Sequence, residues 1–355
     1  MKNKFCIVGD MHIGARNANI TVMEHQLYYF EQMFFPYLKK HNITTILQLG
    51  DLFDTRKFSN HLILHNWKRR FFDYMKAEGI EFITLLGNHD IVFKNTIDVN
   101  SSTLFLSHYD NITIIDKATD MDIMGVPFLI VPWICSENRE DIIEKVKNTS
   151  AVYCAGHFEF AGFEINPGQM CDKGEDKSIF EKFDVVYSGH FHTKSYKDNI
   201  QYVGIPYELT WIDYNDPKGF FVFDIKTNKT KYIQNTIPLF VKIYYDDKDK
   251  GSEYFKTIKC NHSSNSYVKL IVTNKTDIYQ FDKLFNKISA LQPIELRIMD
   301  ELEDFDNIEM TEDELKVEAT VDLIDSFVKQ TDTTLDKERV SVILKSLYVE
   351  ALNLS

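Results

Sequence analysis

Short apolar runs alternate with longer helix-like stretches through the first two hundred residues of the chain. Apolar runs of strand length occupy residues 5–9, 43–49, 80–86, 128–132, 152–155 and 185–188. Helical patterns lie between several of them, at residues 21–41, 60–78 and 137–147. Strands that alternate with helices are typical of α/β layering. The pattern therefore predicts an α/β domain, which strands at residues 202–205 and 219–225 complete.

The composition changes near Ile237-Pro238, where a second unit is predicted. Its elements are strands at residues 239–245, 267–273 and 294–299 and a helix at 277–291. This small α/β unit is rich in lysine, and such lysines most often form a solvated face. We therefore predict three regions, residues 1–236, 237–300 and 301–355.

The C-terminal region is acidic first and amphipathic afterwards. Residues 300–314 predict a solvated linker. Beyond it, apolar residues recur at helical spacing over residues 315–328 and again over 340–348. Two amphipathic helices detached from the main core require a surface that covers their apolar faces. That surface is either the chain's own core or a partner protein.

The charge of the chain is unevenly distributed. The net charge is −13 over 355 residues, and 11 of these negative charges lie in residues 300–355. The nearly balanced remainder can carry a local basic groove for nucleic acid. The five cysteines form no CxxC pair, and the sequence contains neither a bilayer-spanning apolar run nor a cleavable signal. These features predict a reducing, cytoplasmic location without a membrane.

Polar motifs close five of the predicted strands and together offer a set of metal ligands. The two aspartates, one asparagine and four histidines are Asp10, His12, Asp51, Asn88, His157, His190 and His192. Loops that follow strands are where α/β sheets place their ligands. Seven such side chains are enough for two divalent cations, with Asp51 as a bridging carboxylate. Mixed oxygen and imidazole ligands suit Mn²⁺ or Fe²⁺, and Zn²⁺ also fits.

Three further polar residues adjoin these ligands. His89 follows a predicted ligand, and a histidine that is not bound to metal can protonate a leaving oxygen. Asp90 is placed to orient His89, and Asp54 to orient His12, His192 or a bound water. Any one of these motifs alone would often be a turn, a helix cap or a loop. Five of them in this order favour a metal site that cleaves phosphoesters.

The chain resembles the calcineurin-like metallophosphoesterases through its five motifs. They are Asp10-Met11-His12, Gly50-Asp51-Leu52-Phe53-Asp54, Gly87-Asn88-His89-Asp90, Gly156-His157 and Gly189-His190-Phe191-His192. Within that superfamily it looks most like the SbcD-type DNA double-strand-break repair nucleases and their phage counterparts. This narrower likeness rests on Gly204-Ile205-Pro206-Tyr207, Trp211 and Lys218-Gly219-Phe220. The resemblance implies a four-layer β-sandwich flanked by helices, a small α/β capping domain and a C-terminal helical tail.

The resemblance also implies roles for individual residues. One metal ion would be held by Asp10, His12, Asp51 and His192. The other would be held by Asp51, Asn88, His157 and His190. His89 would assist at the scissile phosphate. Several cellular relatives carry a histidine at the position of Asp54, and this departure bears on how the exonuclease activity is tuned.

Relatives of this type use Mn²⁺ to degrade DNA ends from 3′ to 5′ and to nick single strands. They dimerise through helices of the nuclease domain, which here would include residues 60–78. Their C-terminal helices, here residues 315–352, bind the coiled-coil root of an SbcC-type ATPase. This chain has no GxxxxGK[ST] loop, so that partner would bind the nucleotide.

The sequence therefore predicts the nuclease subunit of a DNA repair or recombination complex, which a phage could encode. Two rival hypotheses are a phosphatase of the same superfamily and a non-catalytic scaffold on the same fold. The scaffold would be expected to lack ligands, and the motif set is complete.

Overall fold

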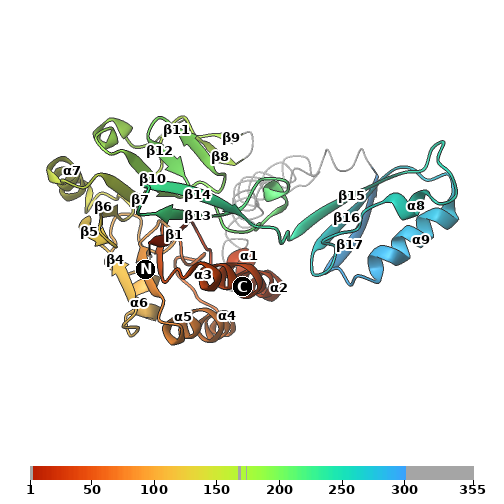
Figure 1. The fold of residues 1–355 in the computed structure, drawn as a ribbon, viewed down its shortest axis with the longest axis horizontal. Coiled ribbons are helices and arrows are strands. Elements are labelled where there is room, and N and C mark those ends of the chain that lie inside the picture. Colours follow the sequence, from red (N-terminus) through yellow and green to blue (C-terminus); the bar gives the residue numbers. More distant parts are fainter. Residues whose placement is uncertain (1–2, 167–168, 173, 301–355) are drawn as a thin grey trace, which may run out of the picture. The chain divides into compact units, whose positions relative to one another are not determined.

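The computed structural model describes residues 3–166, 169–172 and 174–300 (Figure 1). These residues form two six-stranded sheets, a three-stranded sheet and a two-stranded hairpin. The predicted helices at 315–328 and 340–348 and nearly all of the acidic stretch lie outside the described residues. Within the described ranges, no helix is both long and apolar enough to cross a membrane.

The first sheet has the strand order β14-β13-β1-β2-β3-β4. From β1 to β4 the neighbouring strands run parallel, whereas β13 pairs antiparallel with both β1 and β14. The strands are β1 (Lys4–Val8), β2 (Thr45–Gln48), β3 (Glu81–Leu85), β4 (Ile112–Ile115), β13 (Gly219–Asp224) and β14 (Lys229–Gln234). The parallel arrangement brings the carboxyl ends of β1, β2 and β3 to one edge.

The second sheet has the strand order β11-β12-β10-β7-β6-β5. Its four inner strands run parallel, and its two edge strands are antiparallel to their neighbours. The strands are β5 (Thr119–Ile123), β6 (Val126–Val131), β7 (Tyr153–His157), β10 (Val185–Gly189), β11 (Ser195–Lys197) and β12 (Ile200–Tyr202). The hairpin consists of β8 (Glu164–Asn166) and β9 (Gln169–Met170).

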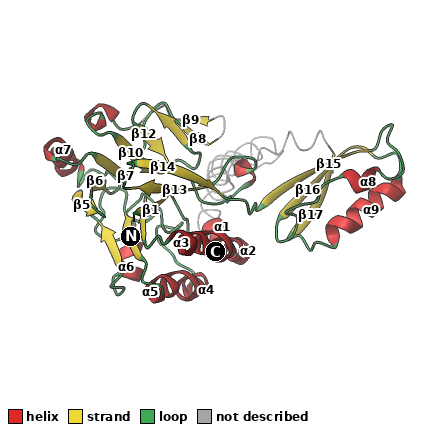
Figure 2. Ribbon diagram, in the orientation of Figure 1, coloured by secondary structure: helices red, strands yellow, loops and turns green. Residues whose placement is uncertain are grey.

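The two sheets share one apolar core. Phe5 and Leu47 from the first sheet belong to the same buried cluster as Phe128 and Ile130 from the second. Side chains alternate between the faces of a strand, so the other face of each sheet needs separate cover. On the second sheet, that cover includes Ile142 and Val146 of α7 (Arg139–Asn148). The result is a pair of facing sheets with helices on their outer faces (Figure 2).

Two long helical segments follow the first two strands. The first segment comprises α2 (Ile20–Tyr29), a π-helical stretch (Phe30–Phe34) and α3 (Phe35–His41). The second segment comprises α4 (His61–Trp67), a π-helical stretch (Lys68–Phe72) and α5 (Asp73–Ala77). Asn19 and Asn60 begin them, because each asparagine side chain accepts hydrogen bonds from the first turn. Their buried aromatic rings meet edge to face, as Phe30 does with Trp67 and Phe71.

Shorter helical elements also occur among the described residues. They are α1 (Ala15–Ala18), α6 (Ser101–Leu106) and the 3₁₀ turns Lys177–Phe180 and Trp211–Asp213.

Residues 240–300 form a small α/β unit with its own core. Its sheet is fully parallel, in the order β15 (Phe240–Asp246), β16 (Tyr267–Asn274) and β17 (Glu295–Asp300). The connections carry α8 (Tyr254–Thr257) and α9 (Ile278–Ser289). Leu284 and Ile288 of α9 are fully buried in this core.

These elements confirm the α/β expectation and most of the predicted strands and helices. The sequence pattern missed β4, β5, β11 and β14, because these short strands are partly exposed and mix polar with apolar residues. The strand predicted at 202–205 was wrong in position, since β12 ends at Tyr202. All five cysteines are buried, as predicted for Cys6 and Cys154.

Candidate active site

The ends of five parallel strands bring the predicted ligands together. Asp10, Asp51 and Asn88 lie just after β1, β2 and β3, at the carboxyl edge of the first sheet. His157 is the last residue of β7, and His190 follows β10 in the second sheet. The two sheets meet at this edge, where the His190 backbone N–H donates to both oxygens of Asp10 at 3.0 and 3.1 Å.

The first group of ligand atoms comes from Asp10, His12 and His192, whose ligand atoms all lie within 4.8 Å of one another. His12 Nε2 is 3.1 Å from His192 Nε2 and 3.9 Å from Asp10 Oδ2. Asp10 and His12 are buried. The structure thus brings these three residues together.

The second group comprises Asp51, His157 and His190, again within 4.8 Å. His157 Nε2 is 3.3 Å from Asp51 Oδ2. Asn88 belongs here too, because its Oδ1 lies 3.0 Å from both His157 Nε2 and His190 Nδ1. His157 Nδ1 donates to the Leu49 carbonyl at 2.7 Å, which leaves Nε2 to face the group.

The two groups adjoin each other through Asp10. One of its oxygens lies 3.9 Å from His12 Nε2 in the first group, and the other lies 3.9 Å from His157 Nδ1 in the second. Buried carboxylate, amide and imidazole atoms that converge in two adjacent groups form the donor set that a pair of divalent cations requires. The residues present therefore fit two metal ions.

Several backbone positions around these ligands are strained or crowded. His12, Asp51 and His190 have φ values of 47°, 48° and 86°, in the left-handed region that most residues avoid. Such strain is often stored at functional sites. A Cβ on Gly189 would lie 2.4 Å from the Leu49 carbonyl oxygen. Glycine is needed there for close approach, whereas Gly50, with φ of 88°, is needed for its turn.

Local electrostatics raise the pKa of some histidines in the two groups and lower the pKa of others. Burial would lower the pKa of His12, but the hydrogen bond and charge of Asp54 raise that pKa to about 9. Burial and the charge of nearby His12 lower the pKa of His192 to about 3. Burial also opposes the protonation of His157, but Asp51 and Asp10 outweigh it and raise the pKa of His157 to about 9.

Burial and neighbouring charges also shift the pKa values of the remaining ligands. Burial and the charge of His157 lower the pKa of His190 to about 3. Burial raises the pKa of the Asp10 carboxyl to about 6. Despite burial, His157 and His89 hold the pKa of Asp51 well below its usual range. Asp51 is therefore anionic at neutral pH, which favours the binding of a cation.

We expect metal affinity to fall as the pH is lowered. Because the raised pKa values of His12 and His157 favour imidazolium below about pH 9, a cation must displace a proton from each. The apparent Mn²⁺ affinity should then rise about tenfold per pH unit for each proton released. Calorimetric titration from pH 6 to 8, in two buffers of different ionisation enthalpy, would measure the Mn²⁺ affinity and the number of protons released. A constant affinity without proton release would contradict this expectation.

His89 stands beside the first group but is held by Asp54, not by Asp90. Its Nδ1 lies 2.6 Å from the Asp54 backbone oxygen, and its backbone N–H donates to Asp51 Oδ1 at 2.7 Å. The Asp54 carboxylate contacts His12 Nδ1 at 3.1 Å, which matches one of the partners expected for it. His12, Asp54 and His89 thus form a third cluster of potential ligand atoms.

The expectation that Asp90 orients His89 was wrong. The Asp90 carboxylate is fully buried and accepts backbone N–H groups of Leu52, Phe53 and Gly87 at 3.3, 3.0 and 2.8 Å. A carboxylate that satisfies three backbone donors joins the loop after β2 to the loop after β3. Burial and the negative charge of Asp51 raise the pKa of Asp90 to about 7.

Asp90→Ala should therefore destabilise the fold. Its removal leaves three buried N–H groups without an acceptor, at a cost of about 3–5 kcal/mol. Urea unfolding of metal-free protein, followed by circular dichroism, measures the difference. Asp90→Asn keeps an acceptor oxygen and should lose much less. A free energy of unfolding within about 1 kcal/mol of wild type for the alanine variant would contradict this role.

Sequence reasoning missed several residues that support the site. The buried Gln48 amide donates to the Gly9 and Gly50 carbonyls, and its own oxygen accepts the Thr84 hydroxyl at 2.6 Å. The Tyr207 hydroxyl donates to the Met11 carbonyl at 2.5 Å. Apart from the contact between Gln48 and Gly50, these hydrogen bonds connect strands or loops that are far apart in the sequence, so no local pattern predicts them.

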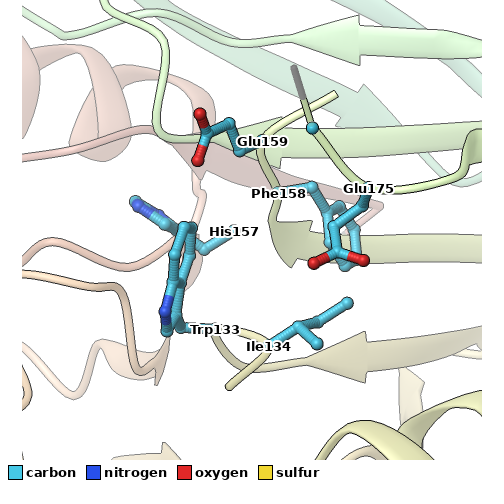
Figure 3. A pocket seen from close by; sticks show the side chains of 7 residues that line it. Trp133, Ile134, His157, Phe158, Glu159 and Glu175 are labelled. Carbon is cyan, nitrogen blue, oxygen red and sulfur yellow. The ribbon is translucent and has the colours of Figure 1, made fainter. Parts of the chain in front are cut away.

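A small pocket opens beside His157 (Figure 3). Trp133 stands next to the His157 ring, with centroids 5.8 Å apart, and its centroid is 5.2 Å from that of His190. Glu159 flanks the opening, with one oxygen 3.8 Å from His190 Nε2. Glu175, on the far side in Figure 3, is paired with Arg139. Sequence reasoning did not single out Trp133, Glu159 or Glu175.

The fold and the site together define a metallophosphoesterase. Residues 3–194 match the model of the calcineurin-like phosphoesterase family, and the chain belongs to that family. It is 32% identical to exonuclease subunit 1 of enterobacteria phage T4, in a match that covers 98% of this chain and 99% of the relative.

Two cellular relatives extend this comparison. The SbcD component of nuclease SbcCD from Staphylococcus epidermidis is 22% identical, over 94% of this chain and 95% of its own length. The DNA double-strand break repair protein Mre11 of Sulfurisphaera tokodaii is 25% identical, over 54% of this chain and 50% of its own. The comparisons confirm the resemblance to the superfamily and to its SbcD-type branch.

Proposed function

We propose that this chain is the two-metal-dependent DNA nuclease subunit of an SbcCD-like repair or recombination complex. The observation that carries the proposal is the convergence of the Asp10 and Asp51 groups of ligand atoms at one sheet edge. The match to a phage exonuclease subunit over nearly the whole of both chains supports nuclease activity, and the similarity to a DNA double-strand break repair protein supports DNA as the substrate. The proposed activities are 3′ to 5′ exonuclease and single-strand endonuclease.

We assign Asp10, His12, Asp51 and His192 to one ion and Asp51, Asn88, His157 and His190 to the other. The donor types favour Mn²⁺, with Fe²⁺ and Zn²⁺ as alternatives. When bound, the two ions would supply an activated water and neutralise charge on the phosphate.

His89 serves as the proton donor to the leaving 3′ oxygen. Its Nδ1–H stays on the Asp54 carbonyl, at 2.6 Å, so the imidazolium gives up its proton from Nε2. Because the Asp54 carboxylate contacts His12 at 3.1 Å, Asp54 positions both histidines.

The remaining predictions concern the domain boundaries, the partners and the source of the chain. We propose nuclease, capping and tail regions at residues 1–236, 237–300 and 301–355. The separate core of residues 240–300 supports the first boundary. An SbcC-type ATPase would bind residues 315–352 and supply the nucleotide site, and nuclease-domain helices would form a homodimer. The T4 relative is a phage protein, which supports a phage-encoded enzyme that acts in the host cytoplasm.

The decisive experiment compares substrates. Purified protein with Mn²⁺ is incubated with end-labelled duplex DNA, with single-stranded DNA and with a phosphopeptide, with and without a candidate ATPase. We expect DNA cleavage that chelation by EDTA abolishes. Turnover of the phosphopeptide but not of DNA would favour a phosphatase. Protein that binds no metal and cleaves neither substrate would favour a scaffold.

A further inference from the structure

A buried lysine and two aspartates form a cluster beside His192, one of the proposed ligands. Lys218 is only 4% exposed, although lysine is rarely buried unless it is paired. Its ammonium lies 2.8 Å from Asp213 Oδ1 and 2.7 Å from Asp216 Oδ2. It also donates to the backbone carbonyl of His192 at 3.1 Å. An ammonium has three donors, and these three acceptors use all of them.

The two carboxylates of the cluster are held as well. Asp213 Oδ2 accepts the Leu209 backbone N–H at 2.9 Å, and Asp216 Oδ2 accepts the Thr193 hydroxyl at 3.2 Å. Thr193 directly follows His192 in the chain. The cluster therefore holds two consecutive residues. Lys218 binds the backbone carbonyl of His192, and Asp216 binds the side chain of Thr193.

These contacts matter because His192 lies on a loop. β10 ends at Gly189, and residues 190–194 belong to no helix or strand. The other histidine of this loop, His190, has its backbone N–H fixed by Asp10. A ligand on a loop is accurate only when neighbouring contacts hold it. A buried ion pair is weak evidence for stability, since desolvation offsets much of its attraction.

We propose that Lys218, clamped between Asp213 and Asp216, is a positioning residue that sets His192 for metal binding. This inference rests on the proposed function, because it assumes that His192 is a ligand. Lys218 touches neither substrate nor metal in this role. It acts through the carbonyl of His192, so its loss should affect one metal ion much more than the other.

The test is manganese binding by the full chain, followed by electron paramagnetic resonance and by calorimetry. Lys218→Met keeps much of the side-chain length and removes the ammonium. We expect one of the two bound ions to lose about 10–100-fold in affinity, while the other is retained. Lys218→Arg should recover part of the loss. Two ions bound by Lys218→Met with wild-type affinity would overturn the inference.

A matched control separates positioning from general destabilisation. Asp247 is also buried and accepts the backbone N–H groups of Thr276 and Asp277 at 2.7 Å, within the small unit of residues 240–300. Asp247→Asn should lower the melting temperature and leave manganese binding unchanged. If Asp247→Asn weakens manganese binding as much as Lys218→Met does, the positioning role is refuted.

A second variant guards against a Lys218→Met protein that does not fold. Thr193→Val removes only the hydroxyl that donates to Asp216. It should weaken the same ion more mildly, and wild-type binding would count against the inference. Wild-type protein that binds two ions but does not cleave DNA would overturn the proposed function and leave the role of Lys218 intact.

Discussion

Asp51→Asn is expected to abolish DNA cleavage, with a loss of at least about 10³-fold in single-turnover rate. Asp51 is buried and anionic, and its Oδ2 lies 3.3 Å from His157 Nε2 within the second ligand group. The neutral amide keeps the shape of the side chain but cannot bridge two cations. The loss should therefore come with fewer than two bound metal ions per chain, measured by elemental analysis after gel filtration.

Asp120→Asn provides a control for the loss of one carboxylate. Asp120 lies on β5, in a partly exposed ion pair with Lys145, and is not among the groups that could hold a metal in the described part of the chain. This variant should keep both activity and metal content. An Asp51→Asn protein that cleaves DNA at the wild-type rate would remove the central support for a two-metal mechanism.

His89→Gln should slow DNA cleavage by about 10²–10⁴-fold, the range typical of a lost general acid, while both metal ions stay bound. The reason is geometric, because His89 stands beside His12 with its Nδ1 held by the Asp54 carbonyl, outside both proposed ligand sets. The rate should be measured on a short duplex at saturating Mn²⁺, together with metal content.

A second substrate isolates the proton-transfer step. Bis(p-nitrophenyl) phosphate releases a stable phenolate that needs no proton, so His89→Gln should cleave it nearly as well as wild type. Equal losses on both substrates, or loss of metal, would show that His89 acts as a ligand or a structural residue.

The strands that carry the ligands could be predicted because they are continuous apolar runs that end in polar motifs. β1, β2, β3, β7 and β10 are of this kind, and each lies where the pattern placed it. The edge strands β5 and β14 could not be found in the same way, because half of each faces solvent and neither contains a continuous apolar run. In the small unit, the parallel strands and α9 have clear patterns.

The partners of individual polar side chains were harder to predict. Asp90 follows His89 in the sequence, and this adjacency suggested an orienting role, yet its carboxylate turns toward the Gly87 and Phe53 backbone. Lys218 has a place in the sequence pattern only through a resemblance, although it contacts the backbone of a proposed ligand. Phe53 and the His192 carbonyl lie on loops that folding brings near Asp90 and Lys218.

The amino-acid order is enough to indicate an α/β metallophosphoesterase, because strand-end Asp, Asn and His motifs are local and chemically specific. It also supplies the candidate ligands, since their types already suit divalent cations. Folding decides which of these side chains meet, as when the Asp10 carboxylate contacts both His12 and His157. Such contacts depend on how two sheets approach each other, and no local periodicity encodes that approach.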